Sequence, residues 1–154
     1  MESKVSRRLS EAIGDEICKH LYGPRLERDF KSPFTYMTDL NQAHVLMLKQ
    51  TGLVSADAAR EIAEGLIRME EQGPEAVCLD PRREDAYFNY EARLIEIAGL
   101  EAGGRLHIAR SRNDLSAAID RLKTRDLLLD LMFLIVPIQK NALENAHNDV
   151  LVGK

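Results

Sequence analysis

The chain has 154 residues, of which 45% are apolar and 30% are charged, and its net charge at neutral pH is −4. This length and composition are typical of one soluble globular domain with a buried core, and no Pro/Gly-rich or low-complexity stretch occurs. Acidic and basic residues are mixed along the sequence, so we expect no nucleic acid partner.

The sequence carries no signal for secretion or membrane insertion. Its first residues, Met1 to Lys4, lead into polar sequence, so we expect neither a secretory signal nor a myristoylation site. The richest apolar run, residues 127–138, is too short to span a bilayer. Cys18 and Cys78 lack the spacing of metal ligands and indicate two free thiols in a reducing compartment. We therefore expect a cytoplasmic protein with no metal and no membrane partner.

Nearly every segment has a helical pattern, which predicts an all-α fold. No window alternates apolar and polar residues over the length of a strand, and β-branched residues are sparse. Apolar residues instead recur every three or four positions, as on one face of a helix. The predicted helices, in chain order, are residues 5–21, 33–51, 56–72, 84–98 and 111–149.

The first two predicted helices are separated by a break at Gly23-Pro24. Residues 25–31 are polar and carry no clear pattern. Ser32 is a good N-cap and Pro33 suits the first position of a helix, so we expect the second helix to begin there. Gly52 would end this helix in a left-handed conformation.

The next two helices have clear boundaries. Ser55 is the expected N-cap of a helix that Gly73-Pro74 ends, and residues 74–83 read as a loop. The following helix ends at Gly99. Gly103-Gly104 then predicts a flexible joint before the last helix.

The last predicted helix is unusually long. Residues 111–149 contain no glycine, and only Pro137 interrupts their pattern. A helix of this length would extend about 58 Å, more than the ~40 Å diameter of a compact domain, unless Pro137 kinks or ends it. Residues 127–136 are apolar on nearly every side, which indicates burial against other subunits or a C-terminal continuation. We place a domain boundary between residues 1–110 and 111–154.

The segment from Gly104 to Asp114 reads Gly-Arg-Leu-His-Ile-Ala-Arg-Ser-Arg-Asn-Asp and places three arginines just before the last helix. Guanidinium groups, together with the N–H groups at a helix N-terminus, are the donors that a small dicarboxylate needs. The segment therefore predicts a dicarboxylate-binding site. A structural alternative is that Ser111 or Asn113 merely caps the helix. We expect Arg110 to form an ion pair with Asp114.

This motif resembles the signature that precedes the first core helix of argininosuccinate lyases, which belong to the fumarase/aspartase superfamily. The family's usual form is Gly-Lys-Leu-His-Thr-Gly/Ala-Arg-Ser-Arg-Asn-Asp. Residues 39–48 and 84–91 resemble, in the same order, the family's early helix and its Glu-Asp-Ile-His segment. The resemblance covers all of this chain but only the first part of a family member.

The chain departs from the family pattern at several positions. Tyr87 stands where argininosuccinate lyases carry histidine, Tyr90 where they carry asparagine, and Ile108 where they carry threonine. These departures resemble a divergent subgroup that includes lyases adding diamines or amino acids to fumarate. The amine half of the substrate therefore stays open.

The resemblance implies a carbon–nitrogen lyase that eliminates an amine from an N-succinyl substrate, argininosuccinate or a related compound, and releases fumarate. It implies no metal or organic cofactor, and a homotetramer in which three subunits build each active site. It also implies an all-α architecture, with a small N-terminal helical domain followed by the first long helix of a central helical bundle. The implied substrate-binding residues are His107, Ser111, Arg112, Asn113 and Tyr87.

Several alternatives stay open beside this interpretation. The family's Thr-His-x-Gln segment and its serine-bearing flexible loop would lie beyond Lys154, so we expect this chain alone to be inactive. It could instead be a non-catalytic module that self-associates through the apolar helix, or a fragment without a function of its own. His107 could be a structural histidine and Tyr87 a core residue. We interpret His44, on the apolar face of its helix, as a core residue.

Overall fold

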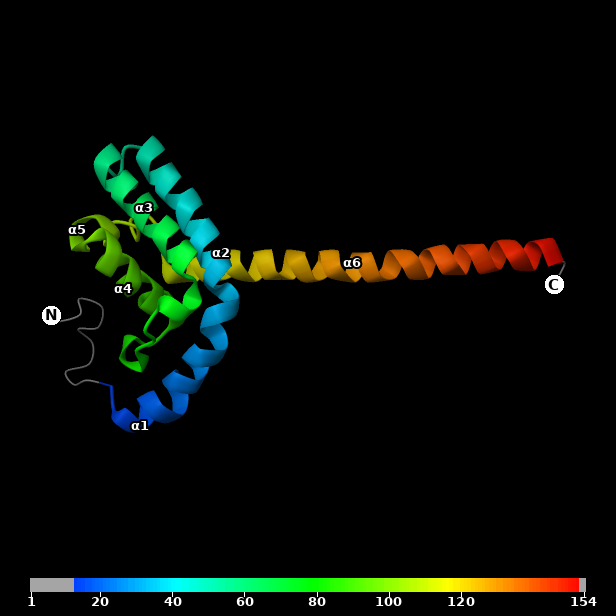
Figure 1. Cartoon of the computed structure of the whole chain (residues 1–154), viewed down its shortest axis with the longest axis horizontal. Helices are drawn as coiled ribbons and strands as arrows, with labels where there is room; N and C mark the ends of the chain where they lie inside the picture. Colours follow the sequence, from blue (N-terminus) through cyan, green and yellow to red (C-terminus); the bar gives the residue numbers. More distant parts are fainter. Residues whose placement is uncertain (1–12, 153–154) are drawn as a thin grey trace. The chain divides into compact units, whose positions relative to one another are not determined.

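The computed structural model describes residues 13–152, so residues 5–12 of the first predicted helix lie outside it. The described residues are almost entirely helical and contain no strand, which confirms the all-α prediction. The chain divides into two compact units, one ending at Leu115 and the other beginning at Ser116 (Figure 1). We describe each unit by itself.

The first unit begins with one continuous helical stretch. It comprises α1 (Asp15–Ile17), a π-helical turn (Cys18–Tyr22) and α2 (Gly23–Gln50), which follow one another directly. The predicted break at Gly23-Pro24 and the predicted N-cap at Ser32 are therefore wrong.

Packing explains why α2 continues through Pro33. Pro24 stands where the π-helical turn passes into α2, and Pro33 stands inside α2, where a proline costs about 3 kcal/mol. Pro33 is buried beside Phe30 and Phe34, which are 1% and 3% exposed and whose ring centres are 5.8 Å apart. Burial of each phenylalanine stabilises the fold by about 1.5–3 kcal/mol. The core contacts of this face thus offset the cost of the proline.

The helices α3 (Ala56–Gln72) and α4 (Ala86–Ala98) pack against each other and against α2, and Figure 1 shows the three side by side. Ser55 caps α3 as predicted, since its Oγ accepts from the Ala58 N–H at 3.3 Å. Gly73 follows α3 with a φ of +74° and ends it. The predicted apolar stripe of α3 is buried: Ala59, Ile62, Leu66 and Met69.

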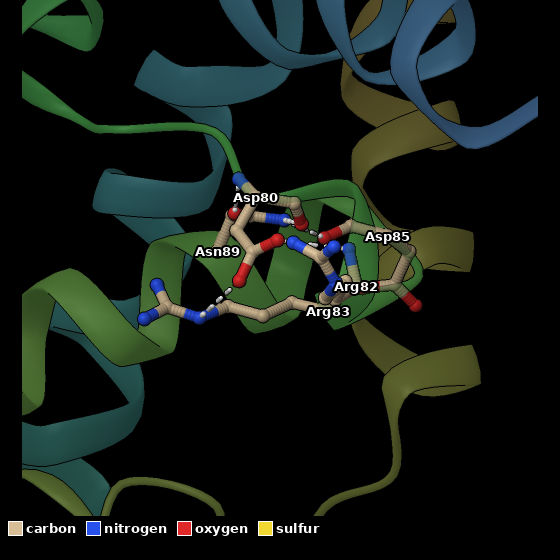
Figure 2. Close-up of polar contacts among 5 residues, drawn as sticks. All are labelled: Asp80, Arg82, Arg83, Asp85 and Asn89. Atoms are coloured by element: carbon tan, nitrogen blue, oxygen red, sulfur yellow. Dashed lines mark hydrogen bonds and ion pairs between the residues drawn. The ribbon is translucent and has the colours of Figure 1, made fainter. Parts of the chain in front are cut away.

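The loop before α4 contains two short 3₁₀ turns, Pro74–Ala76 and Pro81–Arg83. Its end is fixed by Asn89, a side chain of α4 with no exposed surface (Figure 2). Asn89 Nδ2 donates to the carbonyl oxygens of Asp80 and Asp85, at 3.2 and 2.9 Å, and Oδ1 accepts from the Asp80 N–H at 2.7 Å. Because every hydrogen on this amide has a partner, Asn89 holds Asp85 at the N-cap of α4.

Tyr90 is a core residue of the first unit. It has no exposed surface, and its ring centre lies 5.5 Å from that of Phe34. The Tyr90 hydroxyl is 2.9 Å from Thr38 Oγ1. The Thr38 hydroxyl donates to the Phe34 carbonyl oxygen at 3.0 Å. The buried phenol therefore has a hydrogen-bond partner inside the core.

A short helix that the sequence did not indicate, α5 (Leu100–Gly103), follows α4 directly after Gly99. Gly103 is buried, and a Cβ added to it would lie 3.0 Å from Ile95 Cα and 3.1 Å from Ile95 Cγ1. The prediction of a flexible joint at Gly103-Gly104 is therefore wrong for Gly103. Glycine is needed there so that α5 can approach the backbone of α4 closely.

The helix α6 (Arg112–Val152) has 41 residues and continues through Pro137, so the alternative that it ends at Pro137 is wrong. At 1.5 Å per residue this helix is about 62 Å long. The described part of the second unit is the portion of this helix from Ser116 on, and on it Phe133 is 76% exposed. Among residues 13–152, no helix combines the length and the apolarity that crossing a membrane requires.

Candidate functional site

The candidate site is formed by the N-terminal half of α4, the loop between α5 and α6, and the first turn of α6. His44 on α2 holds the loop, since its Nε2 lies 3.0 Å from the Ile108 carbonyl oxygen. Burial lowers the pKa of His44, and the charge of Arg110 lowers it further, so the neutral ring donates through Nε2. His44 is thus half-buried at a loop contact rather than in the core. Next to this contact, Ala109 adopts a φ of +61°.

Ser111 and Asp114 cap α6 reciprocally. The Asp114 N–H donates to Ser111 Oγ at 3.3 Å, and the Ser111 N–H donates to Asp114 Oδ2 at 2.8 Å. These bonds lower the pKa of Asp114, as expected for a carboxylate that accepts a backbone N–H at a helix N-terminus. Ser111 therefore caps the last helix, which is the structural role that the sequence left open for it.

The predicted ion pair between Arg110 and Asp114 is wrong. Arg110 Nη2 instead donates to Asn41 Oδ1 on α2 at 2.5 Å, and its guanidinium carbon lies 5.9 Å from the centre of the Tyr87 ring. Asn41 has no exposed surface. Arg110 turns toward the core because a buried amide oxygen needs a donor more than the solvated Asp114 does, which already has the Ser111 N–H.

Arg112 lies between Asp85 and Phe88 at the start of α4. Its Nη1 donates to Asp85 Oδ2 at 2.5 Å, and its guanidinium carbon lies 4.3 Å from the centre of the Phe88 ring. Asp85 Oδ1 caps α4 by accepting from the Phe88 N–H at 3.0 Å. Because one carboxylate serves both roles, Arg112 is fixed to the N-terminus of α4. The salt bridge uses Nη1, and a guanidinium has five N–H donors, so others can reach a ligand.

His107 contacts two side chains of α4. Its Nδ1 lies 3.0 Å from the Tyr87 hydroxyl and 3.8 Å from Glu91 Oε1. Burial raises the pKa of Tyr87 to about 12, so the phenol is protonated at neutral pH. Burial also raises the pKa of Glu91, against the opposing charges of His107 and Arg110.

Beside these residues lies an open depression of about 460 Å³. It brings together four of the five predicted substrate-binding residues, while Tyr87 is 7% exposed and contacts His107 from behind. The residues that line it are Phe88, Glu91, His107, Ser111, Arg112 and Asn113.

The sequence prediction missed Phe88 and Glu91 as lining residues. Both lie in the stretch 84–91, which was singled out for its motif, and they are three residues apart, so they share a face of α4. Helical spacing could have identified them as a pair. Their position next to the loop between α5 and α6 depends on how α4 packs against that loop. Sequence spacing carries no information about this packing.

The chemistry of this depression favours an anion. Arg112 supplies a permanent positive charge, Asn113 an amide, and the first turn of α6 adds the partial positive charge of a long helix. Two donors of this kind, one charged and one neutral, match the two oxygens of a carboxylate. Glu91 is the one acid among the residues that line the depression, and burial raises its pKa.

Known proteins are similar to this chain along almost its whole length. Argininosuccinate lyase 1 of Shouchella clausii is 35% identical over 147 residues, which is 94% of this chain and 30% of that protein. The argininosuccinate lyase of Methanosarcina acetivorans is 36% identical over 147 residues, 94% of this chain and 29% of that protein. That of Methanocaldococcus jannaschii is 30% identical over 148 residues, again 94% and 30%.

No family model matches the chain. The chain spans less than a third of the length of these relatives, and each of them matches 94% of the chain. The motif before α6 and the similarity over 94% of the sequence agree, so the chain belongs to the argininosuccinate lyase family.

Proposed function

We propose that this chain supplies the dicarboxylate-binding part of a carbon–nitrogen lyase active site. The substrate would be argininosuccinate or a related N-succinyl amine, and the product fumarate. The observation that carries the proposal is the depression in which His107, Arg112 and Asn113 meet at the N-terminus of α6. Relatives named argininosuccinate lyase support the reaction class.

The proposed reaction breaks the bond between the amine nitrogen and the succinyl carbon that carries it. A base removes a proton from the neighbouring carbon, and the electron pair left there first enters the adjacent carboxylate, which becomes doubly charged. The amine then leaves with a proton, and the new carbon–carbon double bond completes fumarate. Fixed donors that already surround the carboxylate stabilise this intermediate without reorganisation.

We assign the binding of the substrate carboxylate to Arg112 and Asn113. Arg112 would bind a substrate carboxylate while Asp85 and Phe88 keep its guanidinium in one place. Ser111 would add its hydroxyl while it caps α6, and His107, which also lines the depression, would donate a further hydrogen bond. None of these residues is assigned as the catalytic base.

We further propose that the chain has no lyase activity by itself. Neither a Thr-His-x-Gln segment nor a Gly-Ser-Ser loop occurs in its sequence, and in the family these carry the remaining catalytic groups. The assembly would be a homo-oligomer, a tetramer as the resemblance implies. Other copies or further chain segments would complete the site.

The test is fumarate binding by titration calorimetry. Arg112→Ala should weaken fumarate binding by about 2 kcal/mol, roughly 30-fold, because it removes a charged partner. Arg60→Ala is the matched control, since Arg60 lies on the exposed face of α3 with surface partners only and should leave binding unchanged. Equal affinity in the wild type and Arg112→Ala would contradict the assignment.

A second candidate function is self-association without catalysis. The observation in its favour is the set of apolar side chains on α6, among them Leu127, Phe133 and Ile138, each at least two-thirds exposed. Light scattering at several concentrations distinguishes the candidates. A concentration-dependent oligomer that binds no fumarate would favour the module, and a monomer that binds fumarate would exclude it.

A further inference from the structure

Tyr87 is a buried phenol placed directly behind an imidazole that lines the depression. It is 7% exposed, and its hydroxyl lies 3.0 Å from His107 Nδ1. The two ring centres are 5.5 Å apart. Tyr87 therefore reaches the depression through His107, which suits a residue that positions another side chain.

The surroundings of the Tyr87 hydroxyl fix the direction of its hydrogen bond. Among the described residues, His107 Nδ1 is the partner that the structure gives this hydroxyl, while the Arg110 guanidinium lies over the face of the phenol ring. A neutral phenol has one hydrogen to donate, and leaving that hydrogen unpaired at a buried position would cost free energy. The single phenol hydrogen is then available to His107, and Nδ1 must accept it.

Asn41 anchors this arrangement from α2. Arg110 Nη2 donates to Asn41 Oδ1 at 2.5 Å, and Asn41 is completely buried. Arg110 thus donates to the buried amide oxygen while its guanidinium lies over the Tyr87 ring, and the phenol donates to the imidazole. Asn41 holds Arg110 through its oxygen alone, since its buried Nδ2 has no hydrogen-bond partner among the described residues.

Glu91 is the competing group at the same ring nitrogen. Its Oε1 lies 3.8 Å from His107 Nδ1, beyond hydrogen-bond distance, while the phenol lies within it. The phenol is therefore the hydrogen-bond partner of His107 Nδ1 in the wild-type chain. If the phenol hydroxyl were removed, Glu91 would be the nearest partner of this nitrogen.

We propose that Tyr87 is a positioning residue that holds neutral His107 in the tautomer protonated at Nε2. His107 then offers the depression an N–H donor rather than a bare ring nitrogen. With Arg112 and Asn113, this donor makes the site select for a carboxylate. The role in ligand binding rests on the proposed function above, whereas the tautomer rests on the contacts of Tyr87 alone.

The first experiment measures the tautomer. Long-range ¹H–¹⁵N NMR spectra of the ¹⁵N-labelled chain, at a pH where imidazoles are neutral, identify which ring nitrogen carries the proton. His107→Gln assigns the resonance among the four histidines. The wild type should carry the proton on Nε2. Tyr87→Phe should shift it toward Nδ1, because Glu91 is then the nearest acceptor.

Tyr90→Phe is the matched control, since it removes a buried phenol hydroxyl from the same helix that interacts with Thr38 and Asn41 and not with His107. It should leave the His107 tautomer unchanged. A wild-type proton on Nδ1, or an unchanged tautomer in Tyr87→Phe, would overturn the proposal. A tautomer change of equal size in Tyr90→Phe would overturn it as well, because it would show a general effect of core loosening.

The second experiment connects the tautomer to the ligand. Tyr87→Phe should weaken fumarate binding about threefold to tenfold, the effect of one hydrogen bond, and Tyr90→Phe should not. Unchanged affinity in Tyr87→Phe together with a changed tautomer would refute the role of His107 as a ligand donor. Absence of fumarate binding in the wild type would count against the proposed function, and the tautomer would still decide the role of Tyr87.

Discussion

Asn89→Asp is the substitution that most directly tests how the site is held in place. It keeps the shape of the side chain and the acceptor that receives the Asp80 N–H. It removes the amide hydrogens that go to the carbonyl oxygens of Asp80 and Asp85. At neutral pH it also places a carboxylate oxygen against those two carbonyls, in a position with no exposed surface.

The magnitude follows from these contacts. Two lost hydrogen bonds cost about 1 kcal/mol each, and a buried acceptor left facing other acceptors adds roughly 1–3 kcal/mol. We therefore expect a loss of about 4 kcal/mol in the free energy of unfolding at pH 7. A typical domain has only 5–15 kcal/mol in total, so this loss is easily measured.

The loss should also depend on pH. Burial raises the pKa of the introduced carboxyl in the folded state above its value in the unfolded chain. Such a group lowers stability as pH rises through the interval between the two values. The deficit should therefore be smaller in acid, where the protonated carboxyl can donate to one carbonyl, and should reach its full size at neutral pH.

Urea unfolding followed by near-UV circular dichroism is the appropriate assay. The four tyrosines, Tyr22, Tyr36, Tyr87 and Tyr90, all belong to the first unit, so this signal reports on that unit and not on α6. Asn145→Asp is the control, because Asn145 lies exposed on α6 and should change stability by less than ~0.5 kcal/mol. A loss below 1 kcal/mol in Asn89→Asp would refute the reasoning.

Two further predictions concern packing and charge. Gly103→Ala should lower the free energy of unfolding by about 1–3 kcal/mol, because the added Cβ would press on the Ile95 backbone. Gly14→Ala is the control, since a Cβ there has nothing within 4 Å, and equal free energies of unfolding for the two variants in urea melts would contradict the prediction. Glu91→Gln should flatten the pH dependence of stability. The raised pKa of Glu91 makes the wild type lose stability as pH rises above the ordinary carboxyl range, so parallel stability profiles of the two proteins would count against this prediction.

Helix boundaries were predictable where a local signal and the tertiary packing agree. Ser55 and Gly73 fix both ends of α3 through their own backbone and side-chain chemistry. Pro33 shows the opposite case, because its local signal for a helix start was overridden by the burial of Phe30 and Phe34. Propensity contributes less free energy than the core that a continuous helix allows.

The candidate site was predictable in part for the same reason. His107, Ser111, Arg112 and Asn113 lie within seven residues of one another, so a sequence motif brings them together before any folding. Glu91 and Phe88 join them only through the packing of α4 against the loop. Arg110 was assigned the wrong partner, because its true partner Asn41 is 69 residues away in the chain.

The sequence by itself determined the all-α fold, the family and the donor-rich segment before α6, because helical periodicity and a contiguous motif are local properties. Only the tertiary structure decided what each donor contacts. Arg110 serves the core, Arg112 is held by Asp85, and Tyr87 lies behind His107. These pairings join residues distant in sequence, and buried polar groups choose partners by proximity and polarity, which only the folded chain defines.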